Sequence, residues 1–413
     1  MAVIGGPHAM TCDTAPLQHR GVSFALSEAE LVWSAILRDA VEGELQPVYG
    51  QGQRWQQNLE APVIVPPSRS DLDRYVVPML GLYPARGCPF LCNFCSVIKI
   101  AGRQIRGQSL ATTMASLRAA KAAGVQTIMF TSDNFNKYPG AEALLSAMIE
   151  EQLGLEFFVQ CDTQIARQEN LVALLAKAGC FQMFVGVKSF NRQTLLAAQK
   201  GQNRPETYRD IVRLCREHGI SSHFSNIIGF PQDTEHEVQV HLETLCEMGP
   251  TWASFYILCP IPGTEQYDEF LAANRIVEDN LDRFDTTSLT WRHPYFSRRQ
   301  LAGLLFDCYR RFFSWPHVLR NLRYELSLRS PRRMARSAGS LAISAFNRYC
   351  AWRRMHPMSG GVRPVRVDRV ADYLPLQAFG FELAPLPTSL QLTAAERLLT
   401  PDRHTGRASA AAP

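Results

Sequence analysis

The sequence lacks the long apolar segments that cross membranes, because no run of eighteen or more apolar residues occurs among its 413 residues. Residues 1–10 also lack the basic start and the apolar segment of a secretory signal. The eleven cysteines follow no regular disulfide framework, which fits a reducing compartment. We therefore expect a cytoplasmic protein.

Lysine and acidic side chains are scarce near the C-terminus. Residues 298–369 contain sixteen Arg, no Lys and three acidic residues, so this segment carries a net charge of +13 and the rest of the chain −8. Arg-rich amphipathic helices bind anionic membrane surfaces or other anionic groups, but such a face can equally be solvated or cover another domain. We find no recognisable RNA-binding module here, so we do not expect a nucleic-acid partner.

Three closely spaced cysteines, Cys88, Cys92 and Cys95, are the most informative feature of the chain. Three thiolates from one tight loop can ligate three corners of a four-iron cluster and leave the fourth iron open. Gly87 and Pro89 suit the sharp turns of such a loop. The alternatives are three unrelated core cysteines or a zinc site, although no second Cys or His pair stands nearby to complete a zinc tetrahedron.

The Cys88-x3-Cys92-x2-Cys95 spacing, with its Gly-Cys-Pro and Phe-Cys-Ser flanks, resembles the cluster loop of the radical S-adenosylmethionine (SAM) superfamily. This resemblance extends over about residues 76–270. It implies that the three cysteines are the metal ligands and catalytic residues of a 4Fe-4S cluster, with SAM at the open iron. In this family, one electron from the cluster cleaves SAM to methionine and a 5′-deoxyadenosyl radical, which takes hydrogen from the substrate.

Short apolar runs alternate with helical patterns from residue 76 to residue 285, as in βαβ units around a parallel sheet. The expected strands are residues 77–83, 127–130, 156–160, 183–187, 222–228 and 253–258. The expected helices are residues 110–123, 141–153, 170–178, 205–218 and 235–247. Together with the resemblance, this pattern predicts a partial parallel (β/α)6 radical SAM barrel, whose chemistry would gather at the C-terminal ends of the strands.

Polar residues follow the second and third expected strands. By the resemblance, Asp133 and Asn134 belong to an acidic strand-end motif that binds cofactor, in which Asp133 would accept a hydrogen bond from the SAM amino group. The other interpretation of Asp133 is a helix cap or a turn residue. Gln160 and Asp162 would meet the ribose or the substrate, or are ordinary polar residues at a strand end.

The fourth and fifth strands end in further candidate cofactor-binding residues. Lys188 and Ser189 match a family segment in which Glu usually precedes Ser, and an ammonium cannot accept the hydrogen bonds that a carboxylate accepts. Three interpretations of Lys188 therefore remain. The SAM contacts are rearranged at this position, the lysine faces an anionic group of the substrate, or its side chain is turned out to solvent. Gly229 and Pro231 match a Gly-x-Pro turn that would let the backbone approach the adenine. Residues 260–264 match a Pro-x-Pro-Gly-Thr turn common in this branch.

The first fifty residues are expected to form a strand, a loop, a short strand and a helix, with Ser27 and Glu30 at capping-box spacing. The segment Gly5 to His8 resembles the end of the cobalamin-binding domain that precedes many radical SAM barrels. In that family, the cobalt-ligating histidine lies in an upstream Asp-x-His-x-x-Gly loop, which this sequence lacks, and His8 lies in the wrong loop to replace it. We therefore expect a truncated domain, with cobalamin bound only if an upstream domain exists.

The expected organisation has five parts. These are a partial cobalamin-binding-like, Rossmann-like α/β domain at residues 1–50, a linker at 51–75, the barrel at 76–285, a mostly helical Arg-rich region at 286–400 and a disordered tail at 401–413. Helical patterns in the fourth part cover residues 298–313 and 337–354. Cys161, Cys180, Cys215, Cys246 and Cys259 are expected to be small buried residues without chemistry.

The leading hypothesis is a radical SAM enzyme that acts on a bulky, partly apolar small molecule such as a lipid, a tetrapyrrole or a natural product. Methylation, oxidation and cyclisation all remain open as the reaction. An electron donor such as flavodoxin or ferredoxin, and a peripheral membrane contact, are the expected partners. The alternative is a non-catalytic iron-sulfur adaptor that uses its basic C-terminal region to bind a partner or a membrane.

Overall fold

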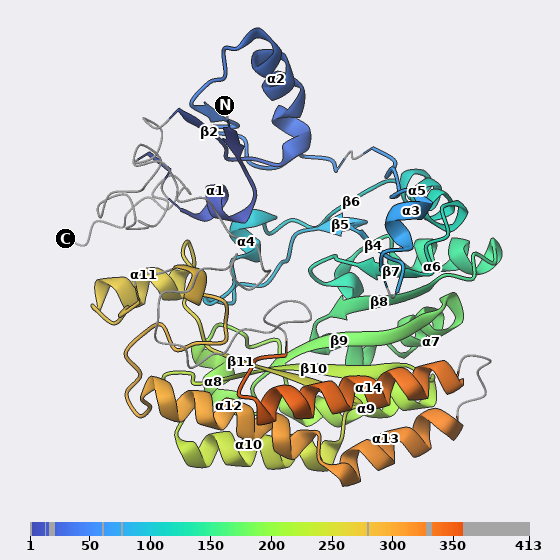
Figure 1. Cartoon of the computed structure of the whole chain (residues 1–413), viewed down its shortest axis with the longest axis vertical. Helices are drawn as coiled ribbons and strands as arrows, with labels where there is room; N and C mark the ends of the chain where they lie inside the picture. Colours follow the sequence, from blue (N-terminus) through green and yellow to red (C-terminus); the bar gives the residue numbers. More distant parts are fainter. Residues whose placement is uncertain are drawn as a thin grey trace.

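A parallel sheet of six strands forms the centre of the molecule (Figure 1). In this computed structural model, the described residues are 2–12, 14–15, 21–59, 62–75, 77–278, 281–327 and 333–357. The sheet has the order β11-β10-β9-β8-β7-β4, with every neighbouring pair parallel. Its strands are β4 (Met79–Leu82), β7 (Thr127–Phe130), β8 (Glu156–Cys161), β9 (Cys180–Lys188), β10 (Ser221–Ile228) and β11 (Trp252–Ile257).

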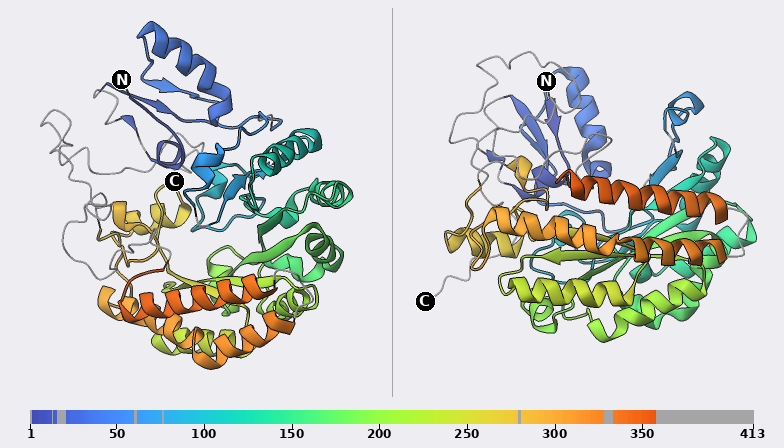
Figure 2. Two further views of the ribbon diagram at one scale, coloured as in Figure 1. Left: turned by 45° about the vertical axis from the view of Figure 1, so that its right-hand side comes forward. Right: turned by 60° about the horizontal axis from the view of Figure 1, so that its bottom comes forward.

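Helices connect these strands and cover one face of the curved sheet (Figures 1 and 2). They are α5 (Leu110–Ala122), α6 (Ala141–Glu150), α7 (Glu169–Ala178), α8 (Arg192–Ala197), α9 (Tyr208–Glu217) and α10 (Glu235–Met248). The arrangement is the partial parallel barrel that the alternating pattern predicts. Gly179 and Gly249 are the C-terminal caps of α7 and α10, and both have the left-handed conformation.

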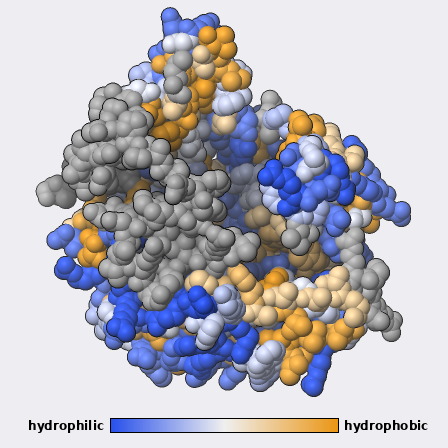
Figure 3. All heavy atoms as spheres, viewed as in Figure 1, coloured by the Kyte–Doolittle hydropathy of each residue, from blue (hydrophilic) through white to orange (hydrophobic). Residues whose placement is uncertain are grey.

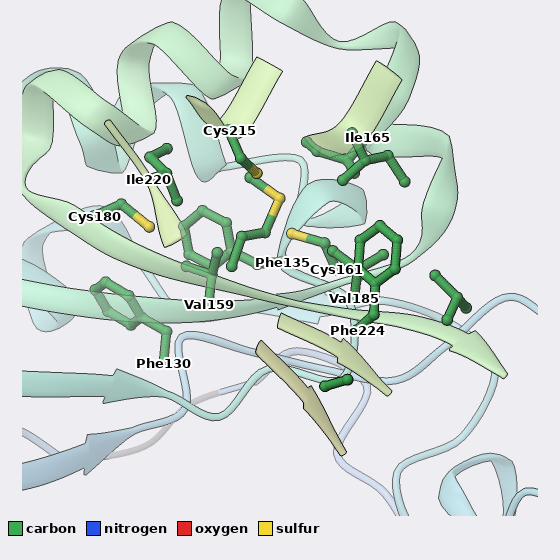
Figure 4. Close-up of a cluster of buried hydrophobic side chains, with 14 of the residues drawn as sticks. Phe130, Phe135, Val159, Cys161, Ile165, Cys180, Val185, Cys215, Ile220 and Phe224 are labelled. Atoms are coloured by element: carbon green, nitrogen blue, oxygen red, sulfur yellow. The ribbon is translucent and has the colours of Figure 1, made fainter. Parts of the chain in front are cut away.

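Buried apolar side chains between the sheet and these helices make the main core (Figure 4). Cys161, Cys180 and Cys215 lie in this core, next to Phe130 and Val159, and all three thiols are buried. Burial raises the pKa of Cys215 to about 12, which keeps its sulfur uncharged. These cysteines are thus small core residues, as expected. Cys259 is also buried, whereas Cys246 is only half-buried.

A second, three-stranded parallel sheet precedes the barrel. It contains β1 (Ala2–Ile4), β2 (Val22–Ala25) and β3 (Val48–Tyr49), with helices α1 (Pro7–Thr11) and α2 (Ala29–Glu42). The predicted loop at Pro7 is instead the first turn of α1, a position that tolerates proline. The predicted capping box is wrong, because the N-cap of α2 is Glu28 and no side chain caps this helix.

The capping prediction fails because arginines from the barrel bind the carboxylates. Glu28 pairs with Arg106 at 2.8 Å and with Arg86 at 3.2 Å. Glu30 accepts a hydrogen bond of 2.6 Å from Arg86. These partners lower the pKa of both carboxyls against the opposing effect of burial. The tertiary ion pairs therefore outweigh a local cap and tie the small sheet to the barrel.

The segment predicted as a linker, residues 51–75, contains one short helix, α3 (Arg69–Leu72), among its described residues. Its Trp55 donates a hydrogen bond of 2.8 Å to the carbonyl of Ile100. A side-chain carbon added at Gly102 would lie 3.3 Å from the same indole. This connection therefore packs on the barrel instead of crossing solvent.

After β11 the chain is helical, with α11 (Glu265–Ala272), α12 (Arg298–Phe312), α13 (Trp315–Ser327) and α14 (Arg333–Trp352). Figure 2 shows α13 and α14 side by side. The sequence pattern predicted α12 and α14 but missed α13, because Pro316 suggests a break although it occupies the tolerated first turn. Among the described helices, none is long and apolar enough to span a bilayer. The predicted tail and the rest of the basic region lie outside the described residues.

Candidate active site

Two short antiparallel strands hold the cysteine loop at the C-terminal side of the barrel. They are β5 (Ala85–Arg86) and β6 (Arg106–Gly107), and the loop between them contains helix α4 (Val97–Ile100). Gly87 has φ +106°, and a side-chain carbon there would lie 2.2 Å from the Gln104 carbonyl oxygen. Only glycine fits this turn, as predicted from its position beside Cys88.

Backbone hydrogen bonds fix the course of the loop. The Cys88 N–H donates to the Gly102 carbonyl at 3.1 Å, and the Cys95 N–H donates to the Cys92 carbonyl at 3.1 Å. The Asn93 N–H donates to the Ala198 carbonyl at 3.2 Å, which anchors the loop to the segment after α8. The cysteines therefore sit on a backbone that is bound at three points.

The three thiols lie close enough to influence one another. Burial raises the pKa of Cys88 to about 11, and the charges of Cys95 and Cys92 add to this shift. Burial also raises the pKa of Cys95, again with a contribution from Cys92. Because metal ligands must be thiolates, a bound cation has to supply the charge that makes these thiols ionise.

Three polar side chains point at these sulfurs. The Asn134 amide donates to Cys88 Sγ at 3.0 Å. The Gln202 amide and the Lys200 ammonium donate to Cys92 Sγ at 3.5 Å and 3.8 Å. Hydrogen bonds to ligand sulfurs stabilise the charge of iron-sulfur clusters and tune their potential, so this donor set fits a cluster.

The same thiols do not resemble the ligands of a single metal ion. Within the described ranges, no three or more Cys, His, Asp and Glu side chains are grouped as one ion would require. A four-iron cluster does not need such a group, because each cysteine binds a different iron.

Asp133 braces the cysteine loop. Its Oδ2 accepts hydrogen bonds from the Tyr83 hydroxyl at 2.8 Å and from the Gly87 N–H at 3.0 Å. Burial raises the pKa of this carboxyl, although the two donors favour its ionised form. Asp133 lies in a turn after β7, and it is not the N-cap of the following 3-10 helix, because that cap is Asn134. It connects the end of β7 to the residue before Cys88.

Lys188 points inward, so the prediction that it could face solvent is wrong. Its backbone has φ +67°, a left-handed conformation that is uncommon for a side-chain-bearing residue. Its Nζ donates to Ser225 Oγ at 2.7 Å. Burial and the nearby Lys200 ammonium lower the pKa of Lys188 to about 8, and the Cys95 and Cys92 thiols oppose this shift. A lysine with a strained backbone and a buried ammonium beside cysteines is typical of a functional site.

The remaining candidates are distributed around this edge of the sheet. Gln160 is half-buried near the end of β8. Ser189 is buried, and its hydroxyl accepts a hydrogen bond of 3.1 Å from the Asn191 N–H. Asp162 caps a short 3-10 helix, Thr163–Arg167, by accepting a hydrogen bond from the Gln164 N–H at 2.7 Å. Ser189 and Asp162 therefore have structural roles that the strand-end pattern did not reveal.

The Gly-x-Pro turn is shaped by packing. The N–H groups of Gly229 and Phe230 both donate to Asp233 Oδ2, at 2.9 Å and 3.0 Å. Gly229 has φ +78°, and a side-chain carbon there would lie 2.6 Å from the Leu301 side chain of α12. Pro231 follows at a half-buried position. The glycine is thus required by the turn and by α12.

His8 lies on α1, where it lines a cavity of about 190 Å³ with Cys12, Ser96 and Ile100. Ser96 directly follows Cys95, so this cavity adjoins the cysteine loop. The small N-terminal sheet thus contributes one wall next to the candidate site.

Lys200 and Gln202 were not predicted as site residues. Both lie in a polar segment after α8, and Lys200 is 108 residues away from the Cys92 that it contacts. In the same segment, Asn203 is fully buried and donates to the Gly186 and Val187 carbonyls of β9. The polar run at residues 199–203 contains one lysine and three amide side chains. This composition is the sequence feature that could have indicated a part of the site.

Comparison with known families now adds to this geometry. Residues 82–245 match the family model described as "Radical SAM superfamily". The chain therefore contains a segment, residues 82–245, that matches the radical SAM family. Family members use a 4Fe-4S cluster and SAM, which agrees with the donor set around the three cysteines.

Two curated relatives of this chain are named as methyltransferases. An uncharacterized methyltransferase from Pyrococcus horikoshii is 27% identical over 60% of this chain and 55% of that protein. The bacteriochlorophyllide d C-12(1)-methyltransferase of Chlorobaculum tepidum is 25% identical over 73% of this chain and 65% of that protein. The chain thus spans less than two thirds of the length of either relative.

A solved structure shares the fold of this chain. The cobalamin-dependent SAM radical enzyme OxsB, with aqua-cobalamin and SAM bound, aligns with a TM-score of 0.59 at 15% identity. The alignment covers 84% of this chain and 58% of OxsB. At this identity the likeness establishes the fold, a partial barrel, and nothing about the ligands of this chain.

Proposed function

We propose that this chain is a radical SAM enzyme that holds a 4Fe-4S cluster on Cys88, Cys92 and Cys95. One observation carries the proposal: three thiols on one loop lie at the carboxyl edge of a parallel sheet, with nitrogen donors aimed at two of their sulfurs. When bound, the cluster would supply the electron that cleaves SAM into methionine and a 5′-deoxyadenosyl radical. Within the loop, Cys92 is buried, whereas Cys88 and Cys95 are half-buried.

The residues around the loop would position these groups. Asp133 holds the Gly87 turn, and Asn134 donates to Cys88, so both act on the cluster loop in this proposal. Lys188 supplies an inward cation at the same edge, where it would bind an anionic group of SAM or of the substrate. Gln160, Ser189, Gly229 and Pro231 remain proposed contacts of the cofactor.

For the substrate we propose a bulky, mostly apolar small molecule, with methyl transfer as the reaction. The name of the Chlorobaculum relative, a bacteriochlorophyllide methyltransferase, favours a tetrapyrrole-like compound. Cobalamin, which OxsB binds, would then be the methyl carrier on the condition that an upstream domain supplies the cobalt ligand, because the sequence lacks the Asp-x-His-x-x-Gly loop. An electron donor of the flavodoxin or ferredoxin type would reduce the cluster.

Anaerobic reconstitution with iron and sulfide tests the proposal. We expect the purified chain to bind a 4Fe-4S cluster and to form 5′-deoxyadenosine from SAM under a reductant. Cys92→Ala should abolish both, because it removes one cluster ligand. Cys246→Ala is the matched control, since this half-buried cysteine lies outside the loop, and it should change neither.

A loaded cluster that yields no 5′-deoxyadenosine, and whose spectrum does not respond to SAM, would contradict the enzyme proposal. That outcome would instead support the iron-sulfur adaptor. Protein that binds zinc in place of iron would contradict both.

A further inference from the structure

Helix α14 carries its polar side chains inward and its apolar side chains outward. Surface helices of globular proteins normally do the reverse. Among the described residues 334–352, every exposed side chain is apolar or aromatic, and Trp352, Tyr349 and Leu341 are 70%, 49% and 42% exposed. Figure 3 shows the resulting apolar stripe where α14 lies in Figure 1. We call these exposed side chains the outer face of α14.

The polar residues of α14 are used against the barrel. Ser337, Ser340, Ser344 and Asn347 are all buried. Ser340 accepts a hydrogen bond of 3.5 Å from the Trp252 indole. Because small polar residues fill the inward side, the orientation of α14 is fixed by its contacts. The outer face is therefore exposed as a consequence of how the helix packs.

Arg336 also belongs to the inward side of α14. Its guanidinium donates to the carbonyls of Phe181 and Gly219, at 3.2 Å and 3.0 Å. These carbonyls lie at or just before the amino ends of β9 and β10, so the first turns of α14 are anchored at this end of the barrel. Rotating the helix to bury its outer face would break both hydrogen bonds.

The region around the outer face is cationic. Residues 315–357 contain nine Arg, no Lys and one acidic residue, Glu325. Glu325 is only 1% exposed, and it accepts a hydrogen bond of 3.1 Å from Ser221. No carboxylate from this segment therefore offsets the arginines at the surface.

Two arginines flank the aromatic residues of this surface. The Arg353 guanidinium lies 5.8 Å from the ring centre of Trp352. The Arg348 guanidinium lies 5.0 Å from the ring centre of Trp315 on α13, which is itself 58% exposed. Exposed tryptophans beside arginines are typical of helices that lie at a membrane surface, with the ring among the acyl chains and the cation at the headgroups.

We infer that the outer face of α14 binds an anionic lipid surface, with the helix lying flat on it. A 20-residue helix is about 30 Å long, and the apolar stripe runs along it. Apolar burial would supply the attraction, and the arginines would select anionic headgroups. This inference is independent of the proposed radical chemistry.

Charge favours lipid over the other occupants. A second copy of the chain would bring two cationic surfaces together, which is unfavourable. Residues 358–413 contain six Arg and five acidic residues, so they provide no net negative charge to match. An anionic bilayer matches both the apolar stripe and the cationic flanks.

Vesicle flotation of the full chain tests the inference. We expect binding to vesicles of phosphatidylcholine mixed with phosphatidylglycerol, little binding to phosphatidylcholine alone, and weaker binding as salt rises. Replacing Phe346 and Trp352 together with Ser should lower the partition coefficient about tenfold or more. Arg353→Gln should lower it about fivefold at low salt, because one headgroup attraction is lost.

The matched control is the pair Trp33→Ser and Leu37→Ser on α2, which removes similarly exposed apolar side chains elsewhere. It should leave binding unchanged. Circular dichroism of each variant confirms that the fold is intact, which is expected because all these positions are exposed. The inference is overturned if the full chain ignores anionic vesicles, or if the α14 and α2 variants bind alike. Light scattering would then show whether a second copy covers the face.

Discussion

The two ends of the parallel sheet differ in how they treat buried polar groups. At the amino end, side chains of α13 and α14 bond to strand and loop backbone, as when Asn321 donates to the Thr251 carbonyl at 2.8 Å. At the carboxyl end, two lysines and three cysteines are gathered together, and burial raises the pKa of Cys88 and Cys95 and lowers the pKa of Lys188. The polar contacts at the amino end therefore stabilise the fold. At the carboxyl end, ionisable side chains lie where burial disfavours their charged forms, as is typical of reactive sites.

The largest effect on stability is expected at the amino end, from Glu325→Ala. This change leaves Ser221 and Arg336 without their buried carboxylate partner. Removing one member of a buried pair costs about 3–5 kcal/mol. Urea unfolding should show this loss, while the iron content of the folded variant stays that of the wild type. Glu325→Gln, which keeps an acceptor for Ser221, should lose less, and equal losses would contradict this role.

A smaller effect concerns the sheet interior at the same end, where His223 bridges two strands. Its Nδ1 lies 2.8 Å from Gln182 Nε2, and its Nε2 lies 2.7 Å from Ser254 Oγ. Burial lowers the pKa of this imidazole to about 3, below its ordinary value of about 6.5. The unfolded chain therefore binds more protons between pH 6.5 and pH 3, and stability falls as pH falls through this window.

Replacing His223 with Gln removes this titration. Between pH 7 and pH 5, the titration of His223 should lower the free energy of unfolding of the wild type by about 2 kcal/mol. The variant should not show this loss. Urea unfolding at the two pH values measures the difference. Parallel pH profiles would show that His223 does not titrate as its burial implies.

The smallest effect on stability is expected for Lys200→Met. This change should instead alter the redox potential of the site directly. The ammonium lies 3.8 Å from Cys92 Sγ, where its positive charge would stabilise the more negative, reduced state of a bound cluster. Its loss should lower the midpoint potential of the reconstituted cluster, as measured by a redox titration with electron paramagnetic resonance. Lys177→Met, an exposed change on α7, should leave the potential unchanged. Equal midpoint potentials in the two variants would contradict an influence of Lys200 on the cluster.

Local pattern predicted the barrel well, because each strand and helix carries its own signal. The strand at Thr127–Phe130 has the predicted bounds, and the others differ from prediction by a few residues at most. The cysteine loop was likewise visible, since spacing and flanks lie within one segment. The fold thus follows from alternating apolar runs that the chain repeats six times.

Contacts between distant residues could not be predicted in this way. Lys200 reaches Cys92 only through the tertiary fold, and the side chain of Glu28, the N-cap residue of α2, binds Arg106 of the barrel. The exposed face of α14 escaped notice for the same reason. Its composition suggested Arg on the surface, whereas packing selects which side of the helix meets solvent.

The ion pairs of Glu28 have a mechanical consequence. Arg86 and Arg106 stand on the two strands that enter and leave the cysteine loop, and one carboxylate grips both. The small N-terminal sheet is thereby clamped across the base of the loop. A displacement of that sheet would therefore move β5 and β6, and with them the loop that carries the three cysteines.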